Sequence, residues 1–133
     1  MCSASDSKAS AQFARCAAAG KDIVMKSAGN QIRSYCYALD CASALLTVLI
    51  RGRSGEAYNI SNPQSIVTVR ELACAFAAAV GKSVVYENPT DAEKAGFTAM
   101  TNSSLNSEKL EALGWKGLFD LKRGVESTLS GLS

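Results

Sequence analysis

Histidine is absent from this sequence of 133 residues, and its five cysteines include no Cys-x-x-Cys pair. A zinc site of mixed histidine and cysteine ligands is therefore excluded, and the cysteine spacings are not those of an all-cysteine site. The formal net charge is only +2, and lysine and arginine form no long run, which argues against a nucleic-acid partner. The longest apolar helical run, Ala73 to Val80, is far shorter than a bilayer-spanning helix. We expect no metal, nucleic acid or membrane partner.

Length and composition indicate one globular domain. A chain of this size can bury roughly two-thirds of its unfolded surface, and an apolar fraction of 47% is ordinary for a folded protein. We predict a disordered N-terminus over residues 1–5 and a single domain over residues 6–133. Free thiols and the lack of a secretory signal favour a cytoplasmic location, where cysteines stay reduced.

The chain is organised around residues 31–50, which read QIRSYCYALDCASALLTVLI. Tyr35 and Tyr37 alternate with smaller residues and predict a short strand. Asp40 is predicted to cap the following helix, because its carboxylate can accept the first unpaired backbone N–H groups. The apolar residues after it recur with helical spacing, which predicts a helix with one buried face. The unit is therefore a loop carrying Arg33, a strand, a cap and a helix.

The rest of the chain alternates between helical and extended patterns. Helices are predicted at residues 6–19, at 69–80, at 107–113 and after residue 120; strands are predicted at 21–27, 57–61 and 83–87, and residues 90–104 are predicted to be irregular. Two consecutive strand–helix–strand passages favour parallel pairing. The predicted fold class is α/β (mixed α+β), with about five helices and four short strands.

Local signals mark several helix starts. Thr68 and Glu71 have the spacing of a capping box, in which each side chain pairs with the other residue's backbone N–H. Asn106 and Asp120 are predicted to cap the next two helices. Trp115, the only tryptophan, follows a Leu-Gly pair and is interpreted as a packing residue.

Several short motifs occur in an order that resembles a known family. The segment RSYCYALD, residues 33–40, followed by a helix, is similar to a segment of the extended short-chain dehydrogenases/reductases, the NAD-dependent epimerases and dehydratases of nucleotide sugars. The resemblance continues through Gly55–Ile60, Leu113–Trp115 and Gly124–Val125. It extends from about Ser7 to Leu129 and rests on the order and spacing of these motifs together.

Two features of the N-terminal half of that family are absent from this sequence. There is no glycine-rich dinucleotide loop, and none of the four tyrosines is followed by lysine four positions later. The resemblance therefore implies a C-terminal, substrate-binding part of a Rossmann-type enzyme, with no intact dinucleotide-binding half. It implies that NAD is the cofactor of the full-length parent, and that this chain binds no cofactor itself.

The resemblance also implies a set of substrate-binding residues. The backbone of Ile23, Val24 and Met25 would lie along the base of a UDP- or dTDP-linked sugar, and Arg33 would bind the diphosphate with its planar donors. Position alone leaves Arg33 open to another interpretation, as a solvated residue or a partner of Asp40 or a glutamate. Lys94 is placed where relatives have a second arginine, and its alternative is an ordinary surface lysine.

Two functions of different classes follow. The first is the nucleotide-sugar-binding portion of an NAD-dependent epimerase or dehydratase, inactive without the missing N-terminal half. The second is a non-catalytic structural or self-association module that keeps the scaffold without ligand binding. In either case at least one strand edge and one helix face should lack a partner, which favours a homodimer.

Overall fold

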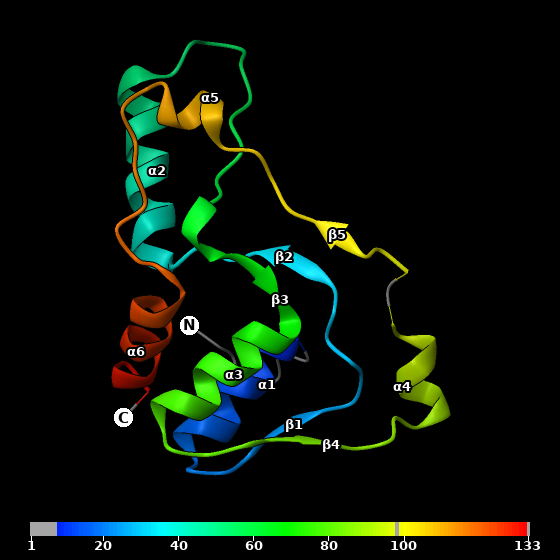
Figure 1. The fold of residues 1–133 in the computed structure, drawn as a ribbon. Helices are drawn as coiled ribbons and strands as arrows, with labels where there is room; N and C mark the ends of the chain where they lie inside the picture. The colour runs from blue at the N-terminus through cyan, green and yellow to red at the C-terminus, as the bar shows by residue number, and fades with distance from the viewer. Residues whose placement is uncertain (1–7, 98, 133) are drawn as a thin grey trace.

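The structure, a computed structural model, describes residues 8–97 and 99–132 (Figure 1). In chain order the elements are α1 (Ala9–Ala18), β1 (Ile23–Met25), β2 (Ile32–Ser34), α2 (Ala38–Arg51), the 3-10 turn η1 (Pro63–Ser65), β3 (Ile66–Thr68), α3 (Val69–Ala79), β4 (Val84–Tyr86), α4 (Asp91–Ala95), β5 (Asn102–Ser103), α5 (Glu108–Glu111) and α6 (Leu121–Ser130). The predicted mixed α/β class is confirmed. The expected N-terminal segment, residues 1–5, lies outside the described residues.

The strands form two small sheets. β1 pairs with β4 in parallel, with Ile23 opposite Val84, as the strand–helix–strand pattern predicts. The second sheet has the order β3-β2-β5, in which β2 is antiparallel to β3 and parallel to β5. The antiparallel pair is not what the sequence pattern favoured.

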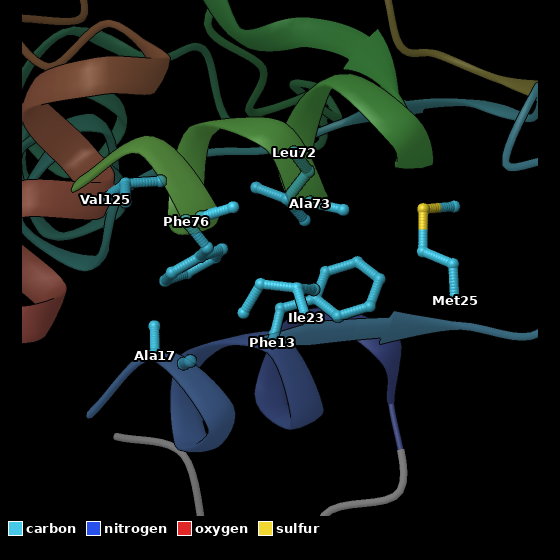
Figure 2. Packing of buried hydrophobic residues seen from close by; sticks show 10 residues of the cluster. Phe13, Ala17, Ile23, Met25, Leu72, Ala73, Phe76 and Val125 are labelled. Atoms are coloured by element: carbon cyan, nitrogen blue, oxygen red, sulfur yellow. The ribbon is translucent and has the colours of Figure 1, made fainter. Parts of the chain in front are cut away.

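The main core lies between three helices and the first sheet. α1, α3 and α6 pack on one another, and α1 and α3 also contact β1, as Figure 2 shows for Phe13, Phe76 and Ile23. Ala14 and Ala17 of α1 are completely or almost completely buried, so this alanine-rich helix lies in close contact with its neighbours. Burial of each large apolar side chain stabilises the fold by about 1.5–3 kcal/mol.

A smaller core holds α2 against α5. Ala44, Leu110 and Trp115 are buried together, and the Trp115 indole N–H donates to the Ser43 hydroxyl at 3.0 Å. The interpretation of Trp115 as a packing residue is confirmed. In Figure 1 this pair of helices stands at one end of the molecule, apart from α1 and α3.

The prediction around Asp40 is wrong in two respects. The strand lies at Ile32–Ser34 rather than at residues 35–37, and α2 begins at Ala38 with Tyr37 as its N-cap. Asp40 is therefore inside the first turn, where it is buried. Its carboxylate accepts backbone N–H groups from Leu118 and Phe119 at 3.0–3.1 Å, so it joins distant segments instead of capping its own helix.

Two other extended or irregular predictions are corrected. Residues 57–61 form no strand. The later segment Ile66–Thr68 forms strand β3 instead, because it pairs with β2. The stretch 90–104 contains α4 and β5. α4 begins with a second capping box, in which Thr90 and Glu93 exchange hydrogen bonds.

The helix caps are predicted more accurately than the strands, because the partners of a capping residue are close to it in sequence. The Thr68–Glu71 capping box is present, and Asp120 accepts the backbone N–H of Arg123 at 2.8 Å. The cap at Asn106 is predicted one residue early, since Ser107 occupies the N-cap position of α5. The Asn106 side chain nevertheless accepts the N–H of the first helical residue, at 2.8 Å.

The predicted buried face of α2 is wrong, because most of its leucines are exposed. The exposed fractions are 61% for Leu45, 58% for Leu46, 80% for Leu49 and 78% for Ile50. The side of α2 that packs on the fold carries Ala44 instead. This finding agrees with the expectation that one helix face lacks a partner.

Within the described residues, no helix is both long enough and apolar enough to span a membrane.

Candidate functional site

Arg33, the predicted diphosphate ligand, lies at the centre of β2 rather than in a loop. Its guanidinium donates to the carbonyl of Ile32 at 2.8 Å and to the carbonyl of Met100 at 3.1 Å. The second contact exists because β2 pairs in parallel with β5, which places the chain entering β5 beside Arg33. The structure places no carboxylate on this guanidinium among the contacts it describes. The two carbonyls fix the orientation of the side chain and leave further N–H donors for an anion.

Ile23, Val24 and Met25 form β1, and their side chains are directed to different sides. Ile23 and Met25 are buried in the main core (Figure 2), whereas Val24 is half-buried. Ile23 and Met25 also use their backbone groups toward β4, so the alternation of a strand directs those of Val24 to the opposite edge. In the described residues no strand pairs with that edge. The backbone of Val24 and its half-buried side chain are therefore the parts of β1 that lie outside the core and outside the pairing with β4.

Lys94 does not lie with the other predicted residues. It is an exposed residue of α4 and pairs with Asp91 of the same helix at 3.2 Å. Lys26, which follows β1, is the lysine that reaches across to α4, where it contacts Glu93 at 2.5 Å. Sequence reasoning missed Lys26; its position immediately after the predicted base-binding strand is the signal that could have indicated it.

Glu93 is held by three donors from two segments. The Lys26 ammonium, the Thr90 backbone N–H and the Thr90 hydroxyl all donate to its carboxylate. The hydrogen bond from Lys26 is the main reason that the pKa of Glu93 falls to about 2. The same contact raises the pKa of Lys26 above its ordinary value. This ion pair joins α4 to the residue that follows β1.

A cavity of about 540 Å³ lies elsewhere, between α1, α3, α6 and the segment entering α2. Its wall is mainly apolar and aromatic and includes Tyr35, Tyr37, Leu39, Phe76 and Phe119. None of the five residues predicted to bind the substrate lines this cavity. This cavity could not be predicted from the sequence, because its walls come from segments that are far apart in the chain.

Burial affects two titratable groups in the wall of the cavity. Burial raises the pKa of the Tyr35 hydroxyl. Burial, aided by the nearby Cys41 thiol, raises the pKa of the Cys36 thiol to about 12, so the thiol stays protonated. Among the described residues, no three His, Cys, Asp or Glu side chains gather as a metal site would require. The cavity offers mainly apolar surface, and its carboxylate, that of Asp120, accepts the backbone N–H of Arg123.

Comparison with known proteins agrees with the sequence motifs. The model of the NAD dependent epimerase/dehydratase family matches residues 2–61. The chain is 31% identical over 103 residues to dTDP-D-glucose 4,6-dehydratase of Homo sapiens. This match covers 76% of this chain and 29% of the human protein. It is 30% identical over 116 residues to dTDP-glucose 4,6-dehydratase 1 of Escherichia coli K12, covering 83% of this chain and 32% of that protein. The chain thus spans about a third of these relatives.

Solved structures share the fold. UDP-glucose 4-epimerase of Thermotoga maritima, in a structure with UDP-glucose, has a TM-score of 0.75 and 25% identity; the match covers 92% of this chain and 38% of that one. A dTDP-glucose 4,6-dehydratase of Bacillus anthracis, in complex with NAD, has a TM-score of 0.73 and 24% identity, over 92% of this chain and 38% of that one. Both are Rossmann-type enzymes of which this chain matches a part.

Proposed function

Since the chain corresponds to a part of an extended short-chain dehydrogenase/reductase of the NAD-dependent epimerase/dehydratase family, we propose that it forms the nucleotide-sugar-binding portion of such an enzyme. The observation that carries the proposal is the placement of Arg33. It lies on a strand, its guanidinium is oriented by two carbonyl groups, and no carboxylate neutralises it among the described contacts. A UDP- or dTDP-linked sugar would supply the diphosphate that such a guanidinium binds.

The base of the nucleotide would lie along the open edge of β1. There the backbone of Val24 is directed away from β4, whereas the side chains of Ile23 and Met25 are buried in the main core. Lys94 is a weaker candidate than Arg33 for binding a phosphate group, because its ammonium already pairs with Asp91. These assignments carry over from the family resemblance, and the geometry at β1 and β2 is compatible with them.

Catalysis would belong to the other half of the enzyme. Hydride transfer needs NAD, and the sequence holds neither a glycine-rich dinucleotide loop nor a Tyr-x-x-x-Lys pair. We therefore propose that the isolated chain binds no cofactor and is inactive, and that an N-terminal dinucleotide-binding half completes it. The unpaired thiols among the described cysteines fit a reducing cytoplasm.

An NMR titration of the ¹⁵N-labelled chain with UDP-glucose and dTDP-glucose tests the proposal, with NAD as a control ligand. We expect shifts around residues 23–33 for one nucleotide sugar and none for NAD. Arg33→Ala should weaken binding about ten-fold or more, because a hydrogen bond to a charged group is lost. Arg53→Ala removes the same charge from an exposed arginine elsewhere and should leave the affinity unchanged. Unchanged spectra with both sugars would refute nucleotide-sugar binding by this chain.

A second function, self-association without ligand binding, is favoured by the exposed leucines of α2. Large exposed apolar patches are uncommon on monomeric proteins. A stable homodimer in sedimentation equilibrium, together with no response to any nucleotide sugar, would favour this alternative over the first.

A further inference from the structure

Two half-buried cysteines lie in contact where the chain enters α2. Cys36 belongs to the segment before the helix, and Cys41 lies in its first turn. The Cys41 thiol donates to the backbone carbonyl of Cys36 at 3.8 Å, and the two thiols are also hydrogen-bonded to each other. Cys16 and Cys74 lie on other helices, α1 and α3. Cys36 and Cys41 therefore form a pair of neighbouring thiols, which we call the dithiol.

The backbone around the dithiol is held in place from two sides. The Cys41 N–H donates to the carbonyl of Tyr37 at 3.0 Å, which fixes the start of α2. The Asp40 carboxylate attaches the same turn to the N–H groups of Leu118 and Phe119. The sulfur atoms of a disulfide lie about 2.05 Å apart. The two thiols are already in contact, so only a small approach is needed to join them.

The dithiol can be reached from solvent. Cys36 lines the cavity of about 540 Å³ described above. Leu39 and Leu132 belong to the wall of this cavity and are 61% and 42% exposed, so the cavity is open on that side. Neither Cys36 nor Cys41 is fully buried. A small oxidant in solution therefore has access to the pair.

We propose that Cys36 and Cys41 are a redox-sensitive modification site, at which a low-molecular-weight disulfide such as glutathione disulfide converts the dithiol into a reversible intramolecular disulfide. In a reducing compartment such disulfides are transient and report a change toward oxidising conditions. The proposal depends on this pair of thiols alone. It holds whether or not the chain binds a nucleotide sugar.

The reaction takes two steps of thiol–disulfide exchange. Cys41 loses its proton, and its sulfur bonds to one sulfur of glutathione disulfide while the S–S bond of the oxidant breaks and one glutathione leaves. Cys36 then loses its proton and bonds to the Cys41 sulfur, which releases the second glutathione. The two protein thiols give up two electrons and two protons, and the two released glutathione thiolates take them up.

The order of attack follows from the surroundings of the two sulfurs. Burial, together with the neighbouring Cys41, raises the pKa of the Cys36 thiol to about 12. Since the thiolate is the nucleophile, the protonated Cys36 is the poorer first attacker. Once Cys41 is bonded to glutathione, its share of this pKa shift is removed, and Cys36 becomes a better nucleophile for the second step.

Peptide mapping of the intact 133-residue chain tests the proposal without any substitution. Cys36 and Cys41 share the tryptic peptide 34–51, whereas Cys74 lies in the peptide 71–82 and serves as an internal control. The chain is equilibrated with an about ten-fold excess of reduced over oxidised glutathione, quenched in acid and digested. We expect peptide 34–51 to lose two hydrogen atoms and carry no glutathione, and dithiothreitol to restore both thiols. Cys74 should stay mainly reduced, because excess glutathione reverses a mixed disulfide at a single thiol.

Two outcomes would overturn the proposal. The first is a peptide 34–51 that stays reduced, or that carries glutathione in place of the internal bond. The second is an equal yield of the bond in urea that unfolds the chain. We expect this yield to fall several-fold in urea, because the fold holds the two thiols in contact.

Single substitutions test the order of attack with glutathione disulfide alone as the oxidant, on variants whose circular dichroism matches that of the unchanged chain. Cys36→Ala should accumulate a glutathione adduct on Cys41, because the thiol that would displace the glutathione is missing. Cys41→Ala should leave Cys36 mainly unmodified over the same time. The reverse pattern would assign the first attack to Cys36 and overturn the proposed order.

Discussion

The carboxylate of Asp40 accepts the backbone N–H of Phe119 at 3.0 Å, across 79 positions of sequence. The same carboxylate accepts the N–H of Leu118. It thereby attaches the first turn of α2 to the segment that enters α6, beside the ring contact between Tyr37 and Phe119. One buried side chain thus connects the two cores of the described fold.

Replacement of Asp40 by asparagine should destabilise the chain. The amide would direct N–H groups toward donors and would remove the charge that strengthens both hydrogen bonds, at a cost of about 1.5–3 kcal/mol. Urea unfolding followed by the fluorescence of Trp115 measures the change. Asp91→Asn, at a fully exposed side chain of α4, is the control and should change the free energy of unfolding by less than about 0.5 kcal/mol. Equal effects of the two substitutions would refute the role assigned to Asp40.

Two leucines that differ in exposure should respond differently to truncation. Leu110 is fully buried between α2 and Trp115, whereas Leu49 is 80% exposed. Leu110→Ala should therefore cost about 2–5 kcal/mol through lost burial and a cavity. Leu49→Ala should be nearly neutral in the free chain, because little area returns to water. A large loss at Leu49 would mean that this exposed side of α2 is already covered in the free chain.

The Thr68–Glu71 capping box gives a local test of helix energetics. Thr68→Ala removes the side chain that accepts the Glu71 N–H at 3.1 Å, and should cost about 1 kcal/mol. Thr47→Ala is the matched control, since Thr47 lies inside α2 and bonds only to the carbonyl one turn earlier. It should be close to neutral, because alanine has the better helix propensity. Urea midpoints of the two variants provide the comparison.

What the sequence predicted well depends on neighbours within one turn. The capping box at Thr68 and the cap at Asp120 follow from spacings of three residues, and both are present. Asp40 was misassigned because its partners come from residues far along the chain. The leucines of α2 were predicted to be helical, which is confirmed, and buried, which is wrong for the described fold. The pattern reveals a need for burial without revealing what supplies it.

The candidate site shows the same division. Arg33 was singled out from the motif around it. Its place on β2 depends on the pairing with β3 and β5, and strands of only two or three residues give too short a pattern to predict that pairing. Lys26 was missed because its partner, Glu93, belongs to a helix in a stretch predicted to be irregular. Contacts of this kind follow from the tertiary arrangement and not from periodicity.

The Lys26–Glu93 ion pair predicts a pH dependence for the attachment of α4. The pKa of Glu93 is lowered from 4.5 to about 2 in the folded chain. Its contribution should therefore be complete above about pH 4.5 and be lost progressively as the pH falls toward 2. The raised pKa of Lys26 acts at the other end: its contribution is complete below its ordinary value of 10.5 and is lost only as the pH rises through the higher folded value.

Carboxyl NMR titration of Glu93 and amide exchange of residues 91–95 measure this dependence. Glu93→Gln should speed exchange in α4 at neutral pH and abolish its acid transition, because the glutamine is neutral at every pH and binds Lys26 weakly. Asp91→Asn preserves both Lys26 and Glu93 and should leave the transition in place. If Glu93 instead titrates near 4.5, the ion pair does not hold α4 in solution. The candidate base-binding edge of β1 would then lack the support of α4 at its end.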